Sequence, residues 1–371
     1  MARVGHVATL STLQLYRRHL QATGDWIALS MRKGRGGSCA HFSPLAGWSR
    51  PYPETTGYLI PTLLDLSRVL GRPEMEVSAL SLGIWLRSIQ AADGYWIGGL
   101  HPPTARQSAS IFNTGQILRG MIALYEHTGE REWLNAAIRG ASWMTRSQER
   151  DGLWPSGDYR ASSTPSYYAY AVAPLLRVWQ CAGDDEMRIA AEKFLRVVCE
   201  RRRENGAFRQ WGFSENAAAP THTIAYTIQG LLESASILND WSNYGEPVVA
   251  ALEFLWRRAE LRGGRLAGAY DENWSGDHGY VCLTGQAQVA SCLLAWERQE
   301  KDLRIVNGAA KCVDVVCKTQ ALSSVIPGLR GAVAGSSPMW GAYMRFRYPN
   351  WAAKYFCDAL TDVTRRIEQE L

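Results

Sequence analysis

The chain has 371 residues, of which 46% are hydrophobic, and a formal net charge of +5 at pH 7. This apolar content is ample for a large core, and no run of about 18 apolar residues occurs that would span a membrane. The basic residues are scattered except for two short clusters at 32–35 and 201–203, so the sequence argues against a nucleic-acid partner.

The eight cysteines form no Cys-x-x-Cys pair, and several fall at apolar positions of predicted helices, where a free thiol behaves as a small hydrophobic group. This usage favours a reducing compartment. The first residues soon reach Gln14, Arg17 and Arg18, so no signal peptide is predicted. We therefore expect a cytoplasmic protein, and the sequence leaves its oligomeric state open.

Helical periodicity runs through the whole chain, and no strand of any length is predicted. The first helix covers about 10–30 and is followed by a long, polar, glycine-rich loop at 33–49. The other predicted helices are 57–70 and 74–90, 112–126 and 131–148, 166–180 and 185–201, 222–238 and 246–260, 283–296 and 302–319, and a last helix at 348–367.

The first helix of each pair opens with a related stretch of small and polar residues that then becomes apolar, as at 221–233. These openings begin near residues 53, 112, 164, 221, 282 and 348, so they recur roughly every 60 residues, a period that indicates a repeat architecture. If the last helix pairs with the N-terminal one, the chain contains six helix pairs.

Helices that are apolar all round alternate with amphipathic ones, which predicts an inner ring buried on all sides and an outer ring exposed on one. Six such pairs close into an all-α (α/α)6 toroid of six inner and six outer helices, and we expect residues 1–371 to form a single domain. An open solenoid is disfavoured because neither end carries a more polar capping repeat.

Two turns that follow outer helices share the motif Gln-x-x-x-Gly-x-Trp, at 90–96 and 148–154. The Gln can hydrogen-bond the turn, the Gly supplies a positive φ, and the Trp stacks back on the helix end, so the motif is predicted to be structural. It resembles the repeat of squalene cyclase and prenyltransferase toroids.

The helix openings carry a more specific resemblance over nearly the whole chain. They include Tyr52-Pro-Glu-Thr-Thr-Gly-Tyr58, Phe112-Asn-Thr-Gly-Gln116, Thr221-His-Thr-Ile-Ala-Tyr226, Cys282-Leu-Thr-Gly-Gln286 and Tyr348-Pro-Asn-Trp351. Together they look like those of a bacterial family of α/α-toroid proteins encoded among exopolysaccharide and capsule biosynthesis genes. The resemblance implies this fold and a polysaccharide pathway, with a glycan or glycolipid as the expected partner.

If all inner helices start at one mouth, and the loops after the outer helices roof it, their polar groups converge on one cavity. The 15 Trp and 16 Tyr suit a sugar-binding cavity, since each ring has an apolar body and a polar handle, although such rings also fill wedges between helices. The candidate substrate-binding residues are Tyr58, Asn113, Gln116, Tyr167, Tyr168, Trp274, His278, Gln286, Trp340, Arg345, Tyr348 and Asn350, with Asp271 and Glu272 as further loop contributors.

Four residues are candidates for catalysis. Glu54 and Asp277 would form a carboxylate pair for glycosidic hydrolysis. Alternatively, Glu54 stabilises a helix start through the macrodipole, and Asp277 belongs to a Ser-Gly-Asp turn. His222 and Tyr226, at i and i+4 on one helix face, would be a general base and acid for an epimerase or lyase. The alternative for them is a hydrogen-bonded core histidine beside a packing tyrosine.

Other chemistries find less support in the sequence. Asp277, His278 and Cys282 are too closely spaced to match the zinc ligands of prenyltransferases, so neither a metal nor a cofactor is predicted. The Asp-x-Asp-Asp motif of terpene cyclases is missing, and the pair at 184–185 falls in a turn before an outer helix. The chain also has no Gly-rich phosphate loop and no Gly-x-Ser-x-Gly elbow.

The sequence therefore favours a carbohydrate-active enzyme of polysaccharide biosynthesis or modification that works by side-chain acid/base chemistry. Glycosidic hydrolysis is the commoner reaction of toroid enzymes, which is an analogy of fold alone. A cytoplasmic location favours a tailoring step such as epimerisation, with β-elimination beside it. A terpenoid- or prenyl-transforming enzyme and a non-catalytic glycan-binding protein are the alternatives.

Overall fold

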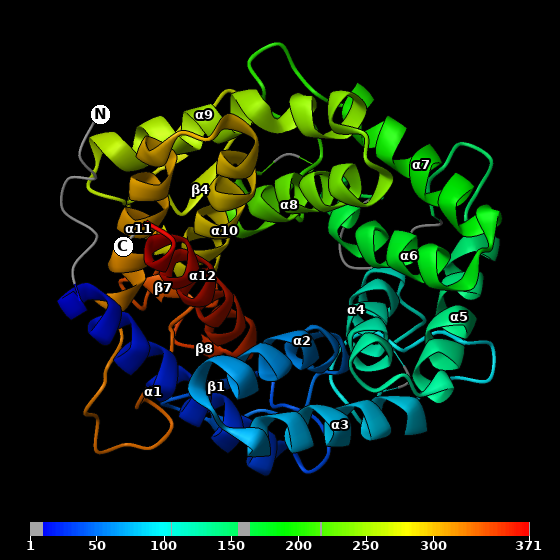
Figure 1. The fold of residues 1–371 in the computed structure, drawn as a ribbon, viewed down its shortest axis with the longest axis horizontal. Coiled ribbons are helices and arrows are strands. Elements are labelled where there is room, and N and C mark those ends of the chain that lie inside the picture. Colours follow the sequence, from blue (N-terminus) through cyan, green and yellow to red (C-terminus); the bar gives the residue numbers. More distant parts are fainter. Residues whose placement is uncertain (1–9, 105, 155–163, 216, 371) are drawn as a thin grey trace.

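Two nested rings of helices make up the chain (Figure 1). The structure is a computed structural model that describes residues 10–104, 106–154, 164–215 and 217–370. Residues 1–9, where no signal peptide is predicted, lie outside the described residues. The inner helices are α2 (Pro53–Leu70), α4 (Ile111–Thr128), α6 (Ala169–Ala182), α8 (Thr221–Leu238), α10 (Leu283–Glu300) and α12 (Asn350–Glu368). The outer helices are α1 (Leu10–Gly34), α3 (Pro73–Ser88), α5 (Arg131–Arg146), α7 (Asp185–Glu200), α9 (Glu246–Leu261) and α11 (Leu303–Cys317).

The inner ring is closed. Each inner helix packs against the next one along the chain, and α12 packs against α2. The outer helices pack on the inner ones, with α1 on α12, so the first and last helices of the chain pair as predicted. These contacts confirm the predicted (α/α)6 toroid.

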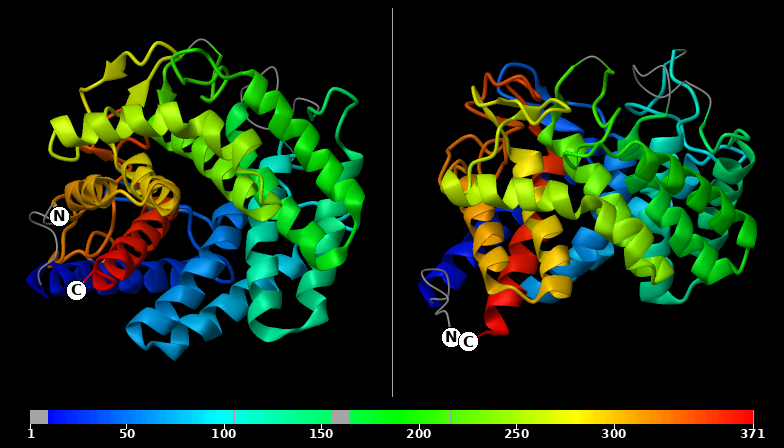
Figure 2. Two further views of the ribbon diagram at one scale, coloured as in Figure 1. Left: turned by 45° about the horizontal axis from the view of Figure 1, so that its top comes forward. Right: turned by 90° about the horizontal axis from the view of Figure 1, so that it is seen from above.

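Short strands tie the helix starts together at one end of the toroid, and the described chain ends lie toward the other (Figure 2). β1 (His41–Ser43) pairs with β2 (Gly47–Trp48) and β8 (Tyr348–Pro349), β3 (Ala219–Pro220) with β4 (Ala269–Tyr270), β4 with β5 (Gly276–Asp277), and β6 (Val281–Cys282) with β7 (Ser336–Ser337). Strands of two or three residues are too short to show alternation, so the sequence gives no sign of them.

Three predicted helix starts differ from the structure by two residues or more. α2 begins at Pro53 rather than 57, and two other helices begin later than predicted because a short local element precedes each. The last inner helix begins at Asn350 rather than 348, since Tyr348 and Pro349 pair with β1. The helix expected at 166 begins as the 3-10 turn η1 (Ser166–Tyr168), which leads into α6.

Glycines set the spacing of neighbouring inner helices. A Cβ atom on Gly57 would lie 2.6 Å from the Cα of Ile117, and one on Gly285 would lie 2.4 Å from the backbone nitrogen of His222. Gly115 and Gly230 are equally crowded by the backbone of α6. Because real Cβ contacts are longer, only glycine allows this close approach. The Thr-Gly repeat of the helix openings therefore serves packing.

The Gln-x-x-x-Gly-x-Trp motif stabilises the ends of outer helices, as predicted. Nε2 of Gln148 donates to the carbonyls of Gly152 and Ala190, both at 2.9 Å, so it joins the turn to the next outer helix. Gly152 has a φ of 84°, and Nε1 of Trp154 donates to the Met144 carbonyl at 2.8 Å. The copy at 90–96 makes equivalent bonds.

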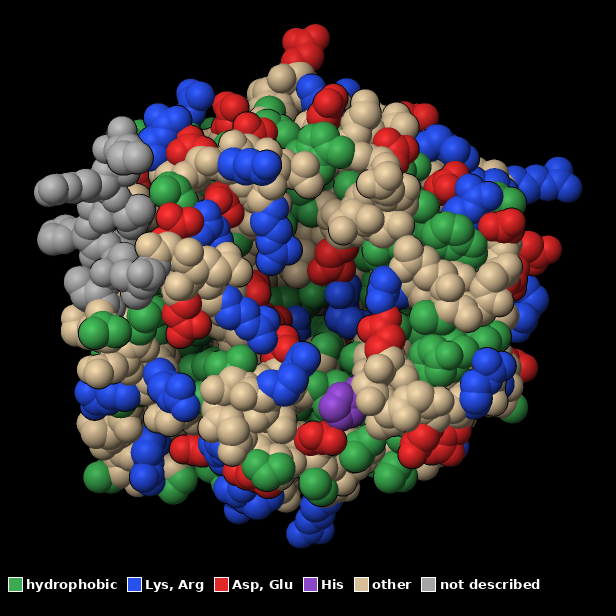
Figure 3. All heavy atoms as spheres, in the orientation of Figure 1, with side chains coloured by type: hydrophobic (Ala, Val, Ile, Leu, Met, Phe, Trp, Pro, Cys, Tyr) green, Lys and Arg blue, Asp and Glu red, His purple; other side chains and the backbone are tan. Residues whose placement is uncertain are grey.

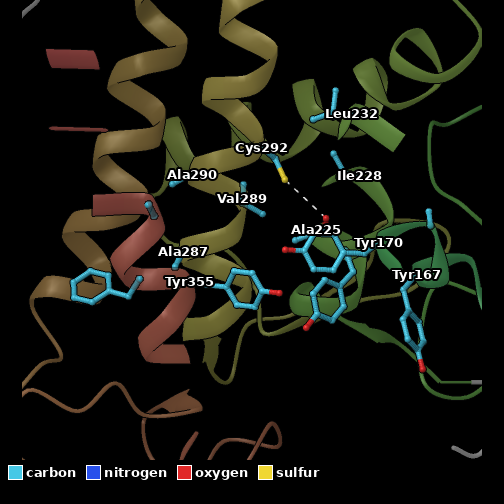
Figure 4. Packing of buried hydrophobic residues seen from close by; sticks show 14 of the residues in the cluster. Tyr167, Tyr170, Ala225, Ile228, Leu232, Ala287, Val289, Ala290, Cys292 and Tyr355 are labelled. Carbon is cyan, nitrogen blue, oxygen red and sulfur yellow. Dashed lines mark hydrogen bonds between the residues drawn. The ribbon is translucent and has the colours of Figure 1, made fainter. Parts of the chain in front are cut away.

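The space between the rings and much of the ring centre are filled by one hydrophobic core (Figure 4). All eight cysteines are unpaired, and six of them are buried. Within the described ranges, no helix is long and apolar enough to cross a bilayer.

Candidate active site

A cavity of about 550 Å³ lies at the end of the ring where the inner helices begin. First-turn residues of α2, α8 and α12 line it, together with one residue from α4, one from η1 and the loops over this mouth. Nine aromatic side chains contribute to the lining: Tyr52, Tyr58, Phe112, Tyr167, Phe213, Tyr226, Tyr280, Tyr343 and Trp351. Such a lining offers flat apolar faces with several hydroxyl groups between them.

Glu54 lies in the first turn of α2, lines the cavity and is only 5% exposed. With the Asn113 amide oriented to satisfy both of its ends, Nδ2 donates to Oε2 of Glu54 at 2.9 Å. Oδ1 of Asn113 then accepts from the backbone N–H of Gly99 at 3.2 Å. Asn113 is fully buried in the first turn of α4. It therefore fixes the Glu54 carboxyl group, and it is not itself part of the cavity lining.

His222 lies in the first turn of α8, which stands opposite α2 in the ring of six inner helices (Figure 1), and it lines the same cavity as Glu54. Its Nδ1 is 2.5 Å from Oε1 of Gln288 on α10. An amide oxygen only accepts, so Nδ1 carries the hydrogen and Nε2 keeps its lone pair. Burial lowers the pKa of His222 to about 4, although the bond to Gln288 acts in the opposite direction. The imidazole is therefore neutral near pH 7, as a proton acceptor must be.

Tyr226 lies one helical turn after His222, and the two ring centres are 4.2 Å apart. It also stacks on Tyr170, which extends from α6 toward Tyr355 of α12 (Figure 4). Burial raises the pKa of Tyr226 well above its ordinary value, and the nearby charge of Glu54 acts in the same direction. The hydroxyl therefore stays protonated and is suited to donate a hydrogen bond.

Most of the other predicted residues of the helix openings lie in or close behind this lining, whereas Gln286 and Tyr348 do not. Tyr58 and Tyr167 line the cavity, and Tyr168 is buried beside Phe112, with ring centres 5.3 Å apart. Gln116 is buried on α4 behind the lining. Asn350 supports the mouth from α12, since its Nδ2 donates to Ser38 and Thr55.

The predicted residues from loops lie elsewhere. Asp277 is exposed, and its Oδ1 accepts from the N–H of Gly279. The Ser-Gly-Asp turn of the alternative interpretation does not form there, because Gly276 and Asp277 belong to β5 and the turn follows them. His278 contacts Arg262, and Trp274 stacks on Phe254. None of the following lines the central cavity: Asp271, Glu272, Trp274, Asp277, His278, Gln286, Trp340, Arg345 and Tyr348. Gln286 instead donates to the carbonyl of Gly264 in the preceding turn.

Several residues of the site were not singled out from the sequence, among them Tyr343, Trp351 and Gln288. Tyr343 lies 5.4 Å from His222, ring centre to ring centre, and its hydroxyl accepts from Nε1 of Trp351 at 2.9 Å. Trp351 stood within a helix-opening motif, whereas Tyr343 comes from a loop without periodicity. Gln288 had a detectable signal, because an amide in an apolar inner helix requires a polar partner.

The fold and the cavity together define an α/α toroid with an aromatic pocket at the starts of its inner helices. No protein-family model matches the sequence, and a search of curated proteins found no match.

Solved structures do resemble the chain over almost its whole length. An unsaturated glucuronyl hydrolase specific for heparin aligns with a TM-score of 0.76 and 15% identity, covering 96% of this chain and 98% of the other. Cellobiose 2-epimerase from Bacillus thermoamylovorans B4167 has a TM-score of 0.76 and 12% identity, covering 96% and 100%. A sugar epimerase from a ruminal bacterium has a TM-score of 0.77 and 10% identity, covering 95% and 98%. At these identities, the likeness establishes the shared toroid fold.

Proposed function

We propose that the chain is a carbohydrate-active enzyme that binds a sugar in the central cavity and transfers a proton to and from it through Glu54 and His222. The observation that carries this proposal is the meeting of these two proton-transfer groups, from opposite inner helices, in one aromatic cavity. The names of the structural neighbours, a glucuronyl hydrolase and two sugar epimerases, support the substrate class.

Each lining group has a distinct chemical capacity. When Glu54 is protonated and His222 is neutral, Nε2 of His222 can accept a proton from a sugar carbon while the Glu54 carboxyl group on the opposite wall donates one. The reverse direction starts from the opposite state, with Glu54 ionised and His222 protonated. Tyr226 donates a hydrogen bond to an oxygen on which negative charge develops. The aromatic side chains stack on the apolar face of a sugar ring.

Proton transfer of the epimerase or β-eliminase kind suits this site better than hydrolysis. Hydrolysis by the usual route needs two carboxyl groups about 5–9.5 Å apart across the bond to be cleaved. Asp277, the predicted partner of Glu54, lies outside the cavity. His222 instead supplies the second proton-transfer group. In view of the resemblance to exopolysaccharide-cluster proteins, we propose a polysaccharide or its precursor as the substrate.

A thermal-shift panel of neutral and acidic oligosaccharides against isoprenoid diphosphates tests the proposed substrate class. A ligand at 100 times its Kd stabilises the fold by about 2.7 kcal/mol, which is readily detected. A stabilising sugar is then incubated with the protein in D₂O. Epimerisation should place deuterium at one sugar carbon without new reducing ends. β-Elimination should release new reducing ends together with an unsaturated sugar.

The other outcomes contradict the proposal in distinguishable ways. Stabilisation by diphosphates alone favours the terpenoid alternative. A sugar that binds without isotope exchange, cleavage or elimination indicates a glycan-binding protein. New reducing ends without isotope exchange and without an unsaturated sugar indicate hydrolysis, which keeps the proposed substrate class and changes the reaction.

A further inference from the structure

A second hollow enters the ring from the opposite mouth, where the inner helices end. Figure 3 shows this face, with acidic and basic side chains around a depression at its centre. Two adjoining cavities of about 560 and 230 Å³ lie here and share Arg119, Gln229, Glu233, Ser291 and Asp362. Every inner helix contributes to their lining.

A layer of tyrosines separates this hollow from the central cavity. Tyr58 and Tyr226 line the central cavity, whereas Tyr170 and Tyr355 line the smaller of the two opposite cavities. The ring centres of Tyr58 and Tyr355 are 5.7 Å apart, and those of Tyr170 and Tyr226 are 4.7 Å apart. The central cavity and the opposite cavity are therefore separate sites, one at each end of the axis of the toroid.

Two cations that line the opposite cavity are each paired with a carboxylate of the same cavity. Arg119 forms an ion pair with Glu233 at 2.8 Å, and Lys354 forms one with Asp358 at 2.6 Å. The Lys354 side chain is only 5% exposed. Arg119 and Lys354 are therefore already compensated, so a free anion gains little from either of them.

The same cavities also leave hydrogen-bonding capacity unused. Nε of Arg119, a donor, and Oε1 of Gln229, an acceptor, are buried without a partner within the described part of the chain. Such groups cost free energy unless something bonds to them. The Arg119 guanidinium lies over the Tyr170 ring, 4.2 Å from its centre, so the donor stands beside an aromatic face.

We propose that this cavity is a second binding site, for a neutral polyhydroxylated ligand such as a sugar. A hydroxyl group both donates and accepts, so one small molecule satisfies Arg119 Nε and Gln229 Oε1 together. A neutral ligand leaves the two ion pairs intact, and the Tyr170 ring can contact its apolar face. This site is independent of the proton-transfer chemistry proposed for the central cavity.

The test is a titration of ¹⁵N-labelled protein with glucose and with cellobiose, observed at the Nε–H resonance of Arg119, which Arg119→Lys assigns. We expect this resonance to shift and saturate. Gln229→Leu removes the acceptor and should weaken binding about tenfold or more, the usual consequence of losing a buried hydrogen bond. His222→Ala, a change in the central cavity, should leave the titration unchanged.

Three results would overturn this second site: no shift with either sugar, a shift that Gln229→Leu leaves unaffected, or a shift that His222→Ala abolishes. The last would assign the sugar to the central cavity. Should Gln229→Leu lower the Tm strongly, Ala295→Phe, which fills the larger cavity from α10, should block binding in its place. The titration is read at the Arg119 resonance, so failure of the second binding site can be told apart from a loss of turnover in the central cavity.

Discussion

Gln288 determines which nitrogen of His222 carries the proton, because its Oε1 lies 2.5 Å from Nδ1. The two residues belong to neighbouring inner helices, α8 and α10, and both are buried. The amide thus directs the lone pair of Nε2 away from itself, as a base in the cavity requires.

Gln288→Leu should remove the preference for the Nδ1–H tautomer and reduce turnover of the sugar found in the panel by about tenfold or more, since only the correct tautomer presents the base. The ¹⁵N chemical shifts of the His222 ring report the tautomer directly. Gln288→Glu, which also accepts from Nδ1, should retain the tautomer and raise the pKa of His222. An unchanged tautomer in Gln288→Leu would contradict this account.

His222 should make folding weaken in acid. Its folded pKa of about 4 lies below the ordinary value of 6.5, so below pH 6.5 the unfolded state binds a proton that the folded state does not. The free energy of unfolding should therefore fall by about 3 kcal/mol between pH 6.5 and pH 4. Urea titrations of the wild type and of His222→Gln over this pH range measure the effect. The free energy of unfolding of His222→Gln should fall less between pH 6.5 and pH 4 than that of the wild type. Equal slopes for both proteins would argue against a neutral buried imidazole.

Glu54→Gln should abolish turnover with little change in Tm, because the amide has nearly the same shape but does not transfer a proton. We expect a loss of at least about 10² in kcat/KM, the usual contribution of general acid/base catalysis. Asn113→Leu, which removes the donor to Glu54, should cause a smaller loss.

The matched control for Glu54→Gln is Asp277→Asn, an exposed carboxylate outside the cavity. It should leave both rate and Tm unchanged. An inactive Asp277→Asn variant would instead support the hydrolytic carboxylate pair of Glu54 and Asp277.

Gly285→Ala should impair both stability and turnover. The added Cβ would lie 2.4 Å from the backbone nitrogen of His222, so α8 and α10 must separate. We expect a loss of about 1–3 kcal/mol, typical of overpacking. Gly230→Ala, with a Cβ 2.2 Å from the Ala169 carbonyl carbon, is equally crowded at the contact of α6 and α8. Denaturation of both variants measures the general destabilisation, and the His222 resonance reports displacement of that side chain. Only Gly285→Ala should shift the His222 resonance.

Asp362→Asn should stabilise the protein at neutral pH. Burial and the charge of Asp358 raise the pKa of Asp362 to about 6, so the folded state holds a proton that the unfolded state releases. Stability is therefore lost as the pH rises from about 4 to 6, the opposite direction to the effect of His222. We expect the variant to gain about 1–2 kcal/mol at pH 7.5 and nothing below pH 4. If the variant is no more stable than the wild type at pH 7.5, the neighbouring groups already offset the cost of burying the ionised Asp362 carboxylate.

The architecture could be predicted from the sequence because it depends on local patterns. Apolar periodicity, glycine and proline breaks and a repeat of roughly 60 residues are sufficient to indicate paired helices in rings. The same repeat brings first-turn residues such as Glu54, His222 and Tyr226 to one mouth, since equivalent positions of a closed repeat meet at one end. Their catalytic function stays a prediction.

Only the tertiary structure decided which other side chains join them. Gln288 lies 66 residues from His222, and Tyr343 comes from a loop with no period, so no local pattern links either to the site. Asp277 was placed outside because its strand pairing and the turn to Gly279 direct that loop to the surface. The opposite cavity likewise exists only because helices distant in sequence bring Arg119, Glu233 and Lys354 together. Local periodicity determines which elements form, whereas burial, charge pairing and protonation depend on contacts between residues far apart in the chain.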